Sequence, residues 1–529
     1  MNVLEVNKLT VSYPGSTEHA VHDLSFTVGC AESVGIVGES GAGKSQTALA
    51  IMGLLPANAQ ITGSIRLGDT EVIGASSATM RQLRAQKAAM IFQDPTTALN
   101  PYMKVGDQLK RILLEHSLAS RSNVRDRCVE MLERVGLPEP DLQYQAFPHQ
   151  LSGGMRQRVL IAAALIGEPD LIVADEATTA LDVTVQAQIL HLLQELQTRF
   201  NTALLLITHD LGIIAQNCQR VLVMNKGRML EQGECRKLLQ RPAHPHTAAL
   251  ISAVSRIDAP APKPRQAPPN EKPLLEVHRL SLGYADRRRG RGGNFFAVQG
   301  FDMSLAAGET IAIVGESGSG KTSLARSIAG LLPGKDGWIS FRGKKLPWRV
   351  EPRSKALRRQ LQMVFQDPVS SLNPAMRIGR IIAEPLTVHS RAARRGDVQQ
   401  AVADMLDRVG LDIGLLERYP HELSGGQAQR VAIARALMTE PSVLICDEAL
   451  AALDGTARRG IIALLQAEQQ RSQLSLIMIT HDFGVVREMC DRVIVMYKGK
   501  IREAGSNEQI FADPQDDYTK ALLAAVPGL

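Results

Sequence analysis

Two glycine-rich segments contain the residues best suited to chemistry. GESGAGKS at 38–45 and GESGSGKT at 315–322 share the spacing G-x-x-x-x-G-K-[ST]. Glycines let backbone N–H groups curl around a phosphate, the lysine can neutralise the β- and γ-phosphates, and the hydroxyl can ligate Mg²⁺. We therefore predict two nucleotide-phosphate sites, formed by Gly38, Gly41, Gly43, Lys44, Ser45, Gly315, Gly318, Gly320, Lys321 and Thr322.

Each copy also has two adjacent carboxylates at the end of an apolar run, in DLIVADE at 170–176 and SVLICDE at 442–448. Four apolar residues in a row are typical of a parallel strand buried on both faces. The aspartate is placed to hold the Mg²⁺ shell, and the glutamate can polarise a water for attack on the γ-phosphate. The predicted residues are Asp175, Asp447, Glu176 and Glu448.

A third pattern, LSGG, occurs before two strongly helical stretches, at 151–154 and 423–426. The serine is a good helix N-cap, and adjacent glycines let a phosphate approach the backbone closely. Capping explains the serine but not the glycines, which favours a second anion site at a helix N-terminus. Its residues are Ser152, Gly153, Gly154, Ser424, Gly425 and Gly426.

Two histidines, His209 and His481, follow the apolar runs ALLLIT and LSLIMIT and precede an aspartate. A lone histidine in such a place is more often structural. Because both lie downstream of two nucleotide motifs, we predict that each contacts the γ-phosphate.

The elements that must position these residues are repeated, since the motifs recur in the same order 272 to 277 residues apart. In each copy a short apolar strand feeds the glycine-rich loop and a helix follows it. A stretch with six prolines in fifteen residues, 259–273, favours an extended spacer. We predict domain 1 at 1–255, a proline-rich linker at 256–273 and domain 2 at 274–529.

Composition excludes several classes of protein. The net charge of +6 does not demand a nucleic-acid partner, and we expect none. The six cysteines are far apart and form no C-x-x-C pair, which argues against a zinc site or a disulfide framework. No apolar run reaches 18 residues and no signal peptide is visible, so we expect a cytoplasmic chain that does not span a membrane by itself.

These motifs together resemble the nucleotide-binding domain of ATP-binding-cassette (ABC) transporters, twice over, across almost the whole chain. The resemblance implies an α/β fold with two tandem P-loop NTPase domains, each with a RecA-like core, an antiparallel β subdomain and a helical subdomain. It implies ATP and Mg²⁺ as ligands and hydrolysis coupled to transport. It also assigns Q-loop glutamines near Mg²⁺, aromatics that stack on adenine, D-loop aspartates and switch histidines. These are Gln93 and Gln366, Tyr13 and Tyr284, Asp182 and Asp454, and His209 and His481.

The resemblance further implies a head-to-tail arrangement, in which each P-loop shares its ATP with the LSGG segment of the other copy. FQDP with LNP, and the tails 244–254 and 513–527, are similar to the di- and oligopeptide, nickel and glutathione importers, including fused peptide importer ATPases. The implied partners are two integral-membrane permease subunits, docked near 94–115 and 367–390, and an extracytoplasmic substrate-binding protein. The chain would lie peripherally on the cytoplasmic face of the inner membrane. Because 236–270 and 505–529 contain no cysteine, we expect no iron–sulfur cluster.

The chain departs from the family pattern at several positions. Ala177 and Ala449 replace the usual proline, whereas Gly455 and Ala428 make the second copy unlike the first and predict unequal sites. The arginine-rich loop from Arg287 to Arg291 is either solvated or a contact for lipid or a partner.

The alternative functions are a soluble tandem ATPase on ribosomes, a DNA-repair cassette, and an importer of nickel chelates or other small solutes. A short proline-rich linker argues against the ribosomal class, and the absence of large insertions and zinc cysteines argues against the repair class.

Overall fold

The computed structural model describes residues 2–15, 18–92, 95–178, 182–254, 257–262, 272–285, 294–347, 353–389, 395–450 and 453–528. The chain divides into two compact units, Met1–Val254 with Pro527–Leu529, and Ser255–Val526. Gln93 and the loop from Arg287 to Arg291 lie outside the described residues, as does the side chain of Tyr284. In the described part of the chain, no helix is both long and apolar enough to cross a membrane.

The first unit is built around a six-stranded sheet of order β10-β9-β3-β8-β7-β6. Its strands are parallel except for β10, which pairs antiparallel with β9. All residues of β3, β7 and β8 are buried, which explains their nearly continuous apolar sequences. The strands are β3 (Ser33–Gly38), β6 (Ala88–Ile91), β7 (Leu171–Asp175), β8 (Ala203–Thr208), β9 (Arg220–Asn225) and β10 (Arg228–Glu234).

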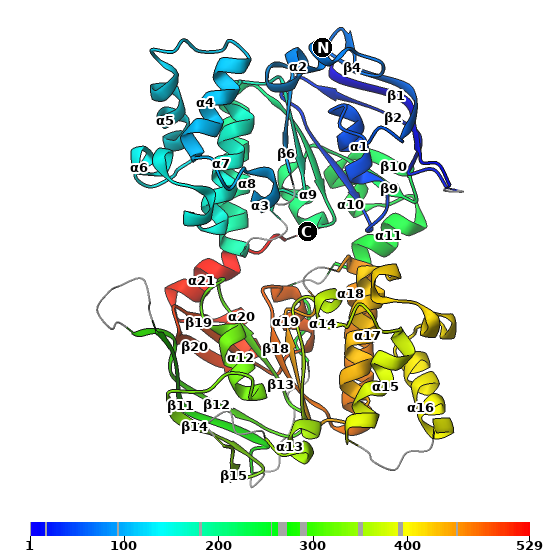
Figure 1. The fold of residues 1–529 in the computed structure, drawn as a ribbon, viewed down its shortest axis with the longest axis vertical. Coiled ribbons are helices and arrows are strands. Elements are labelled where there is room, and N and C mark those ends of the chain that lie inside the picture. The colour runs from blue at the N-terminus through cyan, green and yellow to red at the C-terminus, as the bar shows by residue number, and fades with distance from the viewer. Residues whose placement is uncertain are drawn as a thin grey trace. The chain divides into compact units, whose positions relative to one another are not determined.

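A second sheet and a group of helices flank this core. The antiparallel sheet β2-β1-β4-β5 contains β1 (Asn2–Ser12), β2 (Val21–Gly29), β4 (Gln60–Leu67) and β5 (Thr70–Glu71). It shares an apolar core with α1 (Lys44–Ile51) and one face of the central sheet. On the opposite side lie α4 (Val105–Glu115), α5 (Val124–Arg134), α6 (Pro140–Gln145) and α7 (Gly153–Leu165) (Figure 1).

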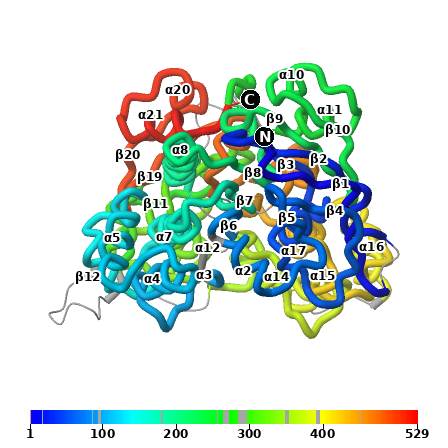
Figure 2. The backbone as a smooth tube through the Cα atoms, turned by 90° about the horizontal axis from the view of Figure 1, so that it is seen from above, coloured from blue at the N-terminus to red at the C-terminus, as the bar shows by residue number. Residues whose placement is uncertain are grey.

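The remaining helices of the first unit cover the central sheet and its edges. They are α2 (Ser77–Gln86), α3 (Pro95–Ala98), η1 (Pro148–Gln150), α8 (Val183–Phe200), α9 (Leu211–Asn217), α10 (Cys235–Gln240) and α11 (Pro245–Ser252). The tail helices α10 and α11 lie beside the edge strand β10 in both views (Figure 2).

The second unit repeats this architecture. Its central sheet has the order β16-β17-β18-β13-β19-β20 and its antiparallel sheet the order β12-β11-β14-β15. The strands are β11 (Leu275–Ala285), β12 (Asn294–Leu305), β13 (Thr310–Val314), β14 (Asp336–Phe341), β15 (Lys344–Lys345), β16 (Leu361–Val364), β17 (Val443–Asp447), β18 (Ser475–Ile479), β19 (Arg492–Tyr497) and β20 (Lys500–Ser506). The predicted α/β class, with a mixed and an antiparallel sheet in each P-loop unit, is confirmed.

The helices of the second unit occupy the equivalent places. They are α12 (Lys321–Ala329), α13 (Lys355–Gln360), α14 (Pro368–Ser371), α15 (Ile378–His389), α16 (Arg395–Arg408), η2 (Ile413–Glu417), η3 (Pro420–Glu422), α17 (Gly425–Leu437), α18 (Gly455–Ser472), α19 (Phe483–Met489), α20 (Asn507–Ala512) and α21 (Asp517–Ala524). The tail helices α20 and α21 contact β20, as α10 contacts β10 in the first unit.

Candidate nucleotide sites

Each glycine-rich loop joins a buried strand to a helix and holds its lysine in place. In the first unit, Lys44 Nζ donates to the carbonyls of Gly38 and Glu39, at 2.8 and 2.9 Å. In the second, Lys321 Nζ donates to Gly315 and Glu316, at 2.7 and 2.8 Å. The loop therefore surrounds a lysine at the helix N-terminus, where the helix dipole favours an anion.

Glycine is required where the loops turn into the helices. Gly43 and Gly320 have φ angles of +95° and +99°, in the region that favours glycine. A Cβ atom at Gly43 would lie 2.4 Å from the carbonyl oxygen of Ala20, and one at Gly320 would lie 2.1 Å from that of Ala297. Gly41 and Gly318 also have positive φ, with open space where a Cβ would stand.

The hydroxyl after each lysine meets the aspartate at the end of the strand that lies two places away in the central sheet. Ser45 Oγ donates to Asp175 Oδ1 and Thr322 Oγ1 to Asp447 Oδ1, both over 3.1 Å. Burial raises the pKa of both carboxyls, and the hydroxyl hydrogen bonds oppose that rise.

This donor set fits Mg²⁺. Hydroxyl and carboxylate oxygens are the hard ligands that the ion prefers, and neighbouring ligands of an octahedral ion with bonds of ~2.0–2.1 Å lie about 2.9 Å apart. The 3.1 Å separation in each unit is close to that value. A buried carboxylate that carries a negative charge also gains from a cation beside it.

The glutamate after each aspartate contacts the switch histidine. His209 Nδ1 lies 3.3 Å from Glu176 Oε1, and His481 Nδ1 lies 4.0 Å from Glu448 Oε1. Glu176 and Glu448 have positive φ angles of +47° and +49°, a conformation that costs about 1–3 kcal/mol for a residue with a side chain. The strained backbone and the histidine together orient the carboxylate at the sheet edge.

Gln366 also reaches this group in the second unit. Its Nε2 donates to Glu448 Oε2 over 2.6 Å. The structure thus brings the Q-loop glutamine, the glutamate and the histidine of the second unit together.

The LSGG segments cap α7 and α17 as predicted from their serines. Ser152 Oγ accepts from Met155 N and Ser424 Oγ from Gln427 N, both over 3.3 Å. The two glycines of a pair are not equivalent. A Cβ at Gly154 would lie 2.9 Å from Val185 Cγ1, whereas one at Gly153 would meet nothing within 4 Å. Packing within the unit accounts for Gly154, whereas no contact within the unit requires a glycine at 153.

The second signature segment shows the same pattern. A Cβ at Gly426 would lie 3.3 Å from Ala457 Cβ, and one at Gly425 would meet open space. The D-loop aspartates are helix N-caps: Asp182 precedes α8, and Asp454 precedes α18 and accepts from Ala457 N over 2.9 Å.

Tyr13 is anchored to helix α1, which follows the first glycine-rich loop. Its hydroxyl donates to Gln46 Oε1, on the helix residue that follows Ser45. Tyr13 directly follows β1, and Tyr284 belongs to β11 of the second unit.

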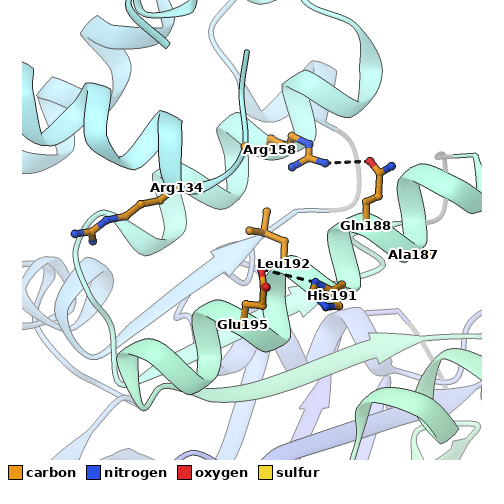
Figure 3. Close-up of a pocket in the computed structure, with 8 residues that line it drawn as sticks. Arg134, Arg158, Ala187, Gln188, His191, Leu192 and Glu195 are labelled. Atoms are coloured by element: carbon orange, nitrogen blue, oxygen red, sulfur yellow. Dashed lines mark hydrogen bonds and ion pairs between the residues drawn. The ribbon is translucent and has the colours of Figure 1, made fainter. Parts of the chain in front are cut away.

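A groove in the first unit lies apart from these residues. It has a volume of about 480 Å³ and is lined by Arg134, Gly136, Arg158, Ala187, Gln188, His191, Leu192 and Glu195 (Figure 3). Arg158 donates to the Val135 carbonyl at 2.6 Å and to Gln188 Oε1 at 3.1 Å, which links the signature helix α7 to the D-loop helix α8. None of the lining residues belongs to the predicted nucleotide sites.

Sequence reasoning missed three residues that touch the predicted sites: Gln46, Arg458 and Tyr518. Arg458 donates to the D-loop carbonyl of Leu453, and Tyr518 accepts from the loop N–H of Glu316. One signal was available for Arg458, since the second copy reads DGTAR where the first reads DVTVQ. Nothing in the sequence pattern indicates that a tail tyrosine meets the glycine-rich loop.

The fold and the paired sites define a tandem P-loop protein of the ATP-binding-cassette type. The family described as "ABC transporter" matches residues 21–179 and 298–451, and "Oligopeptide/dipeptide transporter, C-terminal region" matches 230–291. The chain belongs to the ABC transporter family. It binds and hydrolyses ATP to drive transport, which confirms the predicted class and enzyme activity.

Relatives cover nearly the whole chain. It is 42% identical over 530 residues to the peptidoglycan transport ATP-binding protein YejF of Agrobacterium fabrum, across 99% of this chain and 96% of that one. It is 42% identical over 564 residues to the glutathione import ATP-binding protein GsiA of Escherichia coli K12, across 99% and 90%. A solved dimeric ATP-binding cassette, MJ0796 bound to ADP and Pi, aligns at 25% identity and a TM-score of 0.40, over 44% of this chain and 99% of its own.

Proposed function

We propose that this chain energises the import of peptides or peptide-like small solutes. The observation that carries the proposal is the match along 99% of the chain to relatives named for peptidoglycan transport and glutathione import. The match of residues 230–291 to an oligopeptide/dipeptide transporter region supports the same substrate class.

The two ATP sites are composite in this proposal. The first P-loop, with Asp175, Glu176 and His209, shares its nucleotide with the signature segment 423–426, and the second P-loop, with Asp447, Glu448 and His481, shares its own with 151–154. The open space in front of Gly153 and Gly425 supports this arrangement, because a nucleotide phosphate can approach both backbones.

Hydrolysis follows from the contacts within each unit. Lys44 and Lys321 neutralise the β- and γ-phosphates, and the strand-end glutamate accepts a proton from the attacking water. The histidine beside the glutamate orients it and contacts the γ-phosphate. Mg²⁺ would be held by Ser45, Asp175 and Gln93 in the first site and by Thr322, Asp447 and Gln366 in the second, and it would supply positive charge to the phosphate oxygens. Tyr13 and Tyr284 stack on the adenine.

The remaining partners belong to the membrane. Two permease subunits dock near 94–115 and 367–390, and a substrate-binding protein outside the membrane delivers the solute. The chain lies peripherally on the cytoplasmic face of the inner membrane. Exposed apolar side chains in these regions support the docking, since Tyr102 is 90% exposed and Val369 and Val388 are each 44% exposed.

The test is affinity purification of the tagged chain from detergent-solubilised membranes, with mass spectrometry of the proteins bound to it. Two multi-span proteins in near-equal yield support the proposal. Proteoliposomes containing that complex and its binding protein should then take up dipeptides or glutathione when ATP is supplied. Uptake of nickel chelates alone would mean that the substrates are metal chelates and not peptides. Recovery of ribosomal proteins without a membrane partner would overturn the proposal.

A further inference from the structure

A partly buried ion pair connects two functional segments of the second unit. Arg458 Nη1, in the first turns of α18, lies 2.6 Å from Asp482 Oδ2. The two side chains are only 19% and 20% exposed. Arg458 Nη2 also donates to the carbonyl oxygen of Leu453 over 3.1 Å.

These contacts join the D-loop to the switch histidine. Leu453 and Asp454 immediately precede α18, and Asp454 caps that helix. Asp482 follows His481 and caps α19, where its other carboxylate oxygen accepts from Val485 N over 3.1 Å. Both oxygens of Asp482 are therefore engaged, one by α19 and one by Arg458, so the two loops are held in one relative position.

The first unit has a different residue at this place. Gln186 replaces Arg458, and an uncharged amide cannot form an ion pair with Asp210, the counterpart of Asp482. Asp210 Oδ1 accepts from Gly212 N and Ile213 N, at 2.8 and 3.4 Å. The histidine–glutamate separations also differ, at 3.3 Å for His209 and Glu176 but 4.0 Å for His481 and Glu448.

We propose that Arg458 is a positioning residue that couples the D-loop of the second unit to its switch histidine, His481. Hydrolysis at the second P-loop then depends on the placement of Leu453 and Asp454, whereas the first unit lacks this charged link. The proposal rests on the proposed function, because it assumes that His481 and Glu448 act on the γ-phosphate. It gives the predicted inequality of the two sites a specific structural cause.

Arg458 can couple the two segments because the ion pair that it forms with Asp482 is only partly exposed to solvent. A charge that loses its partner in such a place remains poorly solvated, so the local structure rearranges. Arginine is suited to this link because its planar, always charged group can bind a carboxylate and a carbonyl at once. Lysine keeps the charge but not that geometry.

The test separates the two sites in the full chain within its membrane complex. Glu176→Gln leaves turnover to the second P-loop, and Glu448→Gln leaves it to the first. In the Glu176→Gln background, Arg458→Gln should lower kcat about tenfold, with an unchanged KM for ATP. Arg458→Lys should restore part of kcat. In the Glu448→Gln background, Arg458→Gln should change kcat much less.

Asp482→Asn provides a second variant, because asparagine still caps α19 but carries no charge. It should reproduce the loss, and the double variant Arg458→Gln/Asp482→Asn should lose no more than either single one. Additive losses, equal losses at both sites, or a shift in KM or Tm without a change in kcat would overturn the proposal. Failure of the proposed function is a separate result, since the double variant Glu176→Gln/Glu448→Gln would then still hydrolyse ATP.

Discussion

The hydroxyl of Tyr518 accepts a hydrogen bond from the backbone N–H of Glu316, over 3.1 Å. Tyr518 belongs to the tail helix α21, and Glu316 is the second residue of the glycine-rich loop. The ring of Tyr518 packs against Tyr497 at the end of β19, with centroids 4.5 Å apart. In the first unit the equivalent positions hold His246 and Asn225, whose side chains lie 3.5 Å apart. The tail of the second unit thus supports its P-loop directly.

Tyr518→Phe should weaken ATP binding at the second P-loop about fivefold, because it removes a hydrogen bond worth about 1 kcal/mol and keeps the aromatic packing. Titration with a fluorescent ATP analogue measures this, with Lys44→Ala present to weaken binding at the first P-loop. His246→Phe is the matched control in the first unit. Unchanged affinity in Tyr518→Phe would show that the tail contact has no role in nucleotide binding.

Replacing both Glu176 and Glu448 by glutamine should reduce ATP turnover at least about 100-fold and leave ATP binding intact. Glutamine keeps the size of the side chain but cannot accept a proton from water. Steady-state phosphate release and nucleotide binding to the same preparation provide the two measurements. The single variants should retain different residual rates, because the glutamates have different neighbours. Equal residual rates would contradict the inequality of the two sites.

Much of both sites followed from sequence because the loop motifs prescribe local geometry. Strand, glycine-rich loop, lysine and hydroxyl are consecutive, so Ser45 had to lie at the carboxyl edge of the central sheet. Asp175 lies within reach of it because β7, two strands away from β3, ends at the same edge. The prediction for LSGG was less complete, because it assigned both glycines to a ligand. The structure shows that Gly154 instead faces Val185, which leaves no room for a Cβ atom.

The parts that sequence could not supply depend on long-range packing. Arg458 and Asp482 are 24 residues apart, and Tyr518 and Glu316 are 202 apart. No local sequence pattern specifies which side chains come into contact when helices α18 and α21 pack in the second unit. Comparison of the two copies marked Arg458 as different, but only the structure shows its partner.

Asp175→Asn should abolish the Mg²⁺-dependent part of ATP binding without lowering Tm at pH 7. Burial raises the pKa of Asp175, so the folded state favours the protonated carboxyl, and this contribution to stability is lost as pH rises through the folded-state pKa. At neutral pH the neutral amide therefore removes a cost, and its oxygen can still accept from Ser45. Calorimetric titration of ATP with Mg²⁺ or with EDTA checks the first expectation, and thermal unfolding checks the second. The control disables the second P-loop by Lys321→Ala. If Mg²⁺ still raised the affinity of Asp175→Asn for ATP strongly, Asp175 would not be a ligand of the metal ion.

Gly153→Ala and Gly154→Ala should separate a ligand-facing glycine from a packing glycine. Alanine at 154 would press on Val185, with a contact of 2.9 Å, and should destabilise the unit by about 1–3 kcal/mol. Alanine at 153 meets open space within its unit and improves helix propensity, so it should not lower Tm. It should nevertheless reduce ATPase activity, because a methyl group then occupies the surface that a phosphate must approach. Gly425→Ala should behave like Gly153→Ala. Thermal unfolding and steady-state ATPase rates decide the matter, and full activity in Gly153→Ala would mean that no ligand approaches this face of α7.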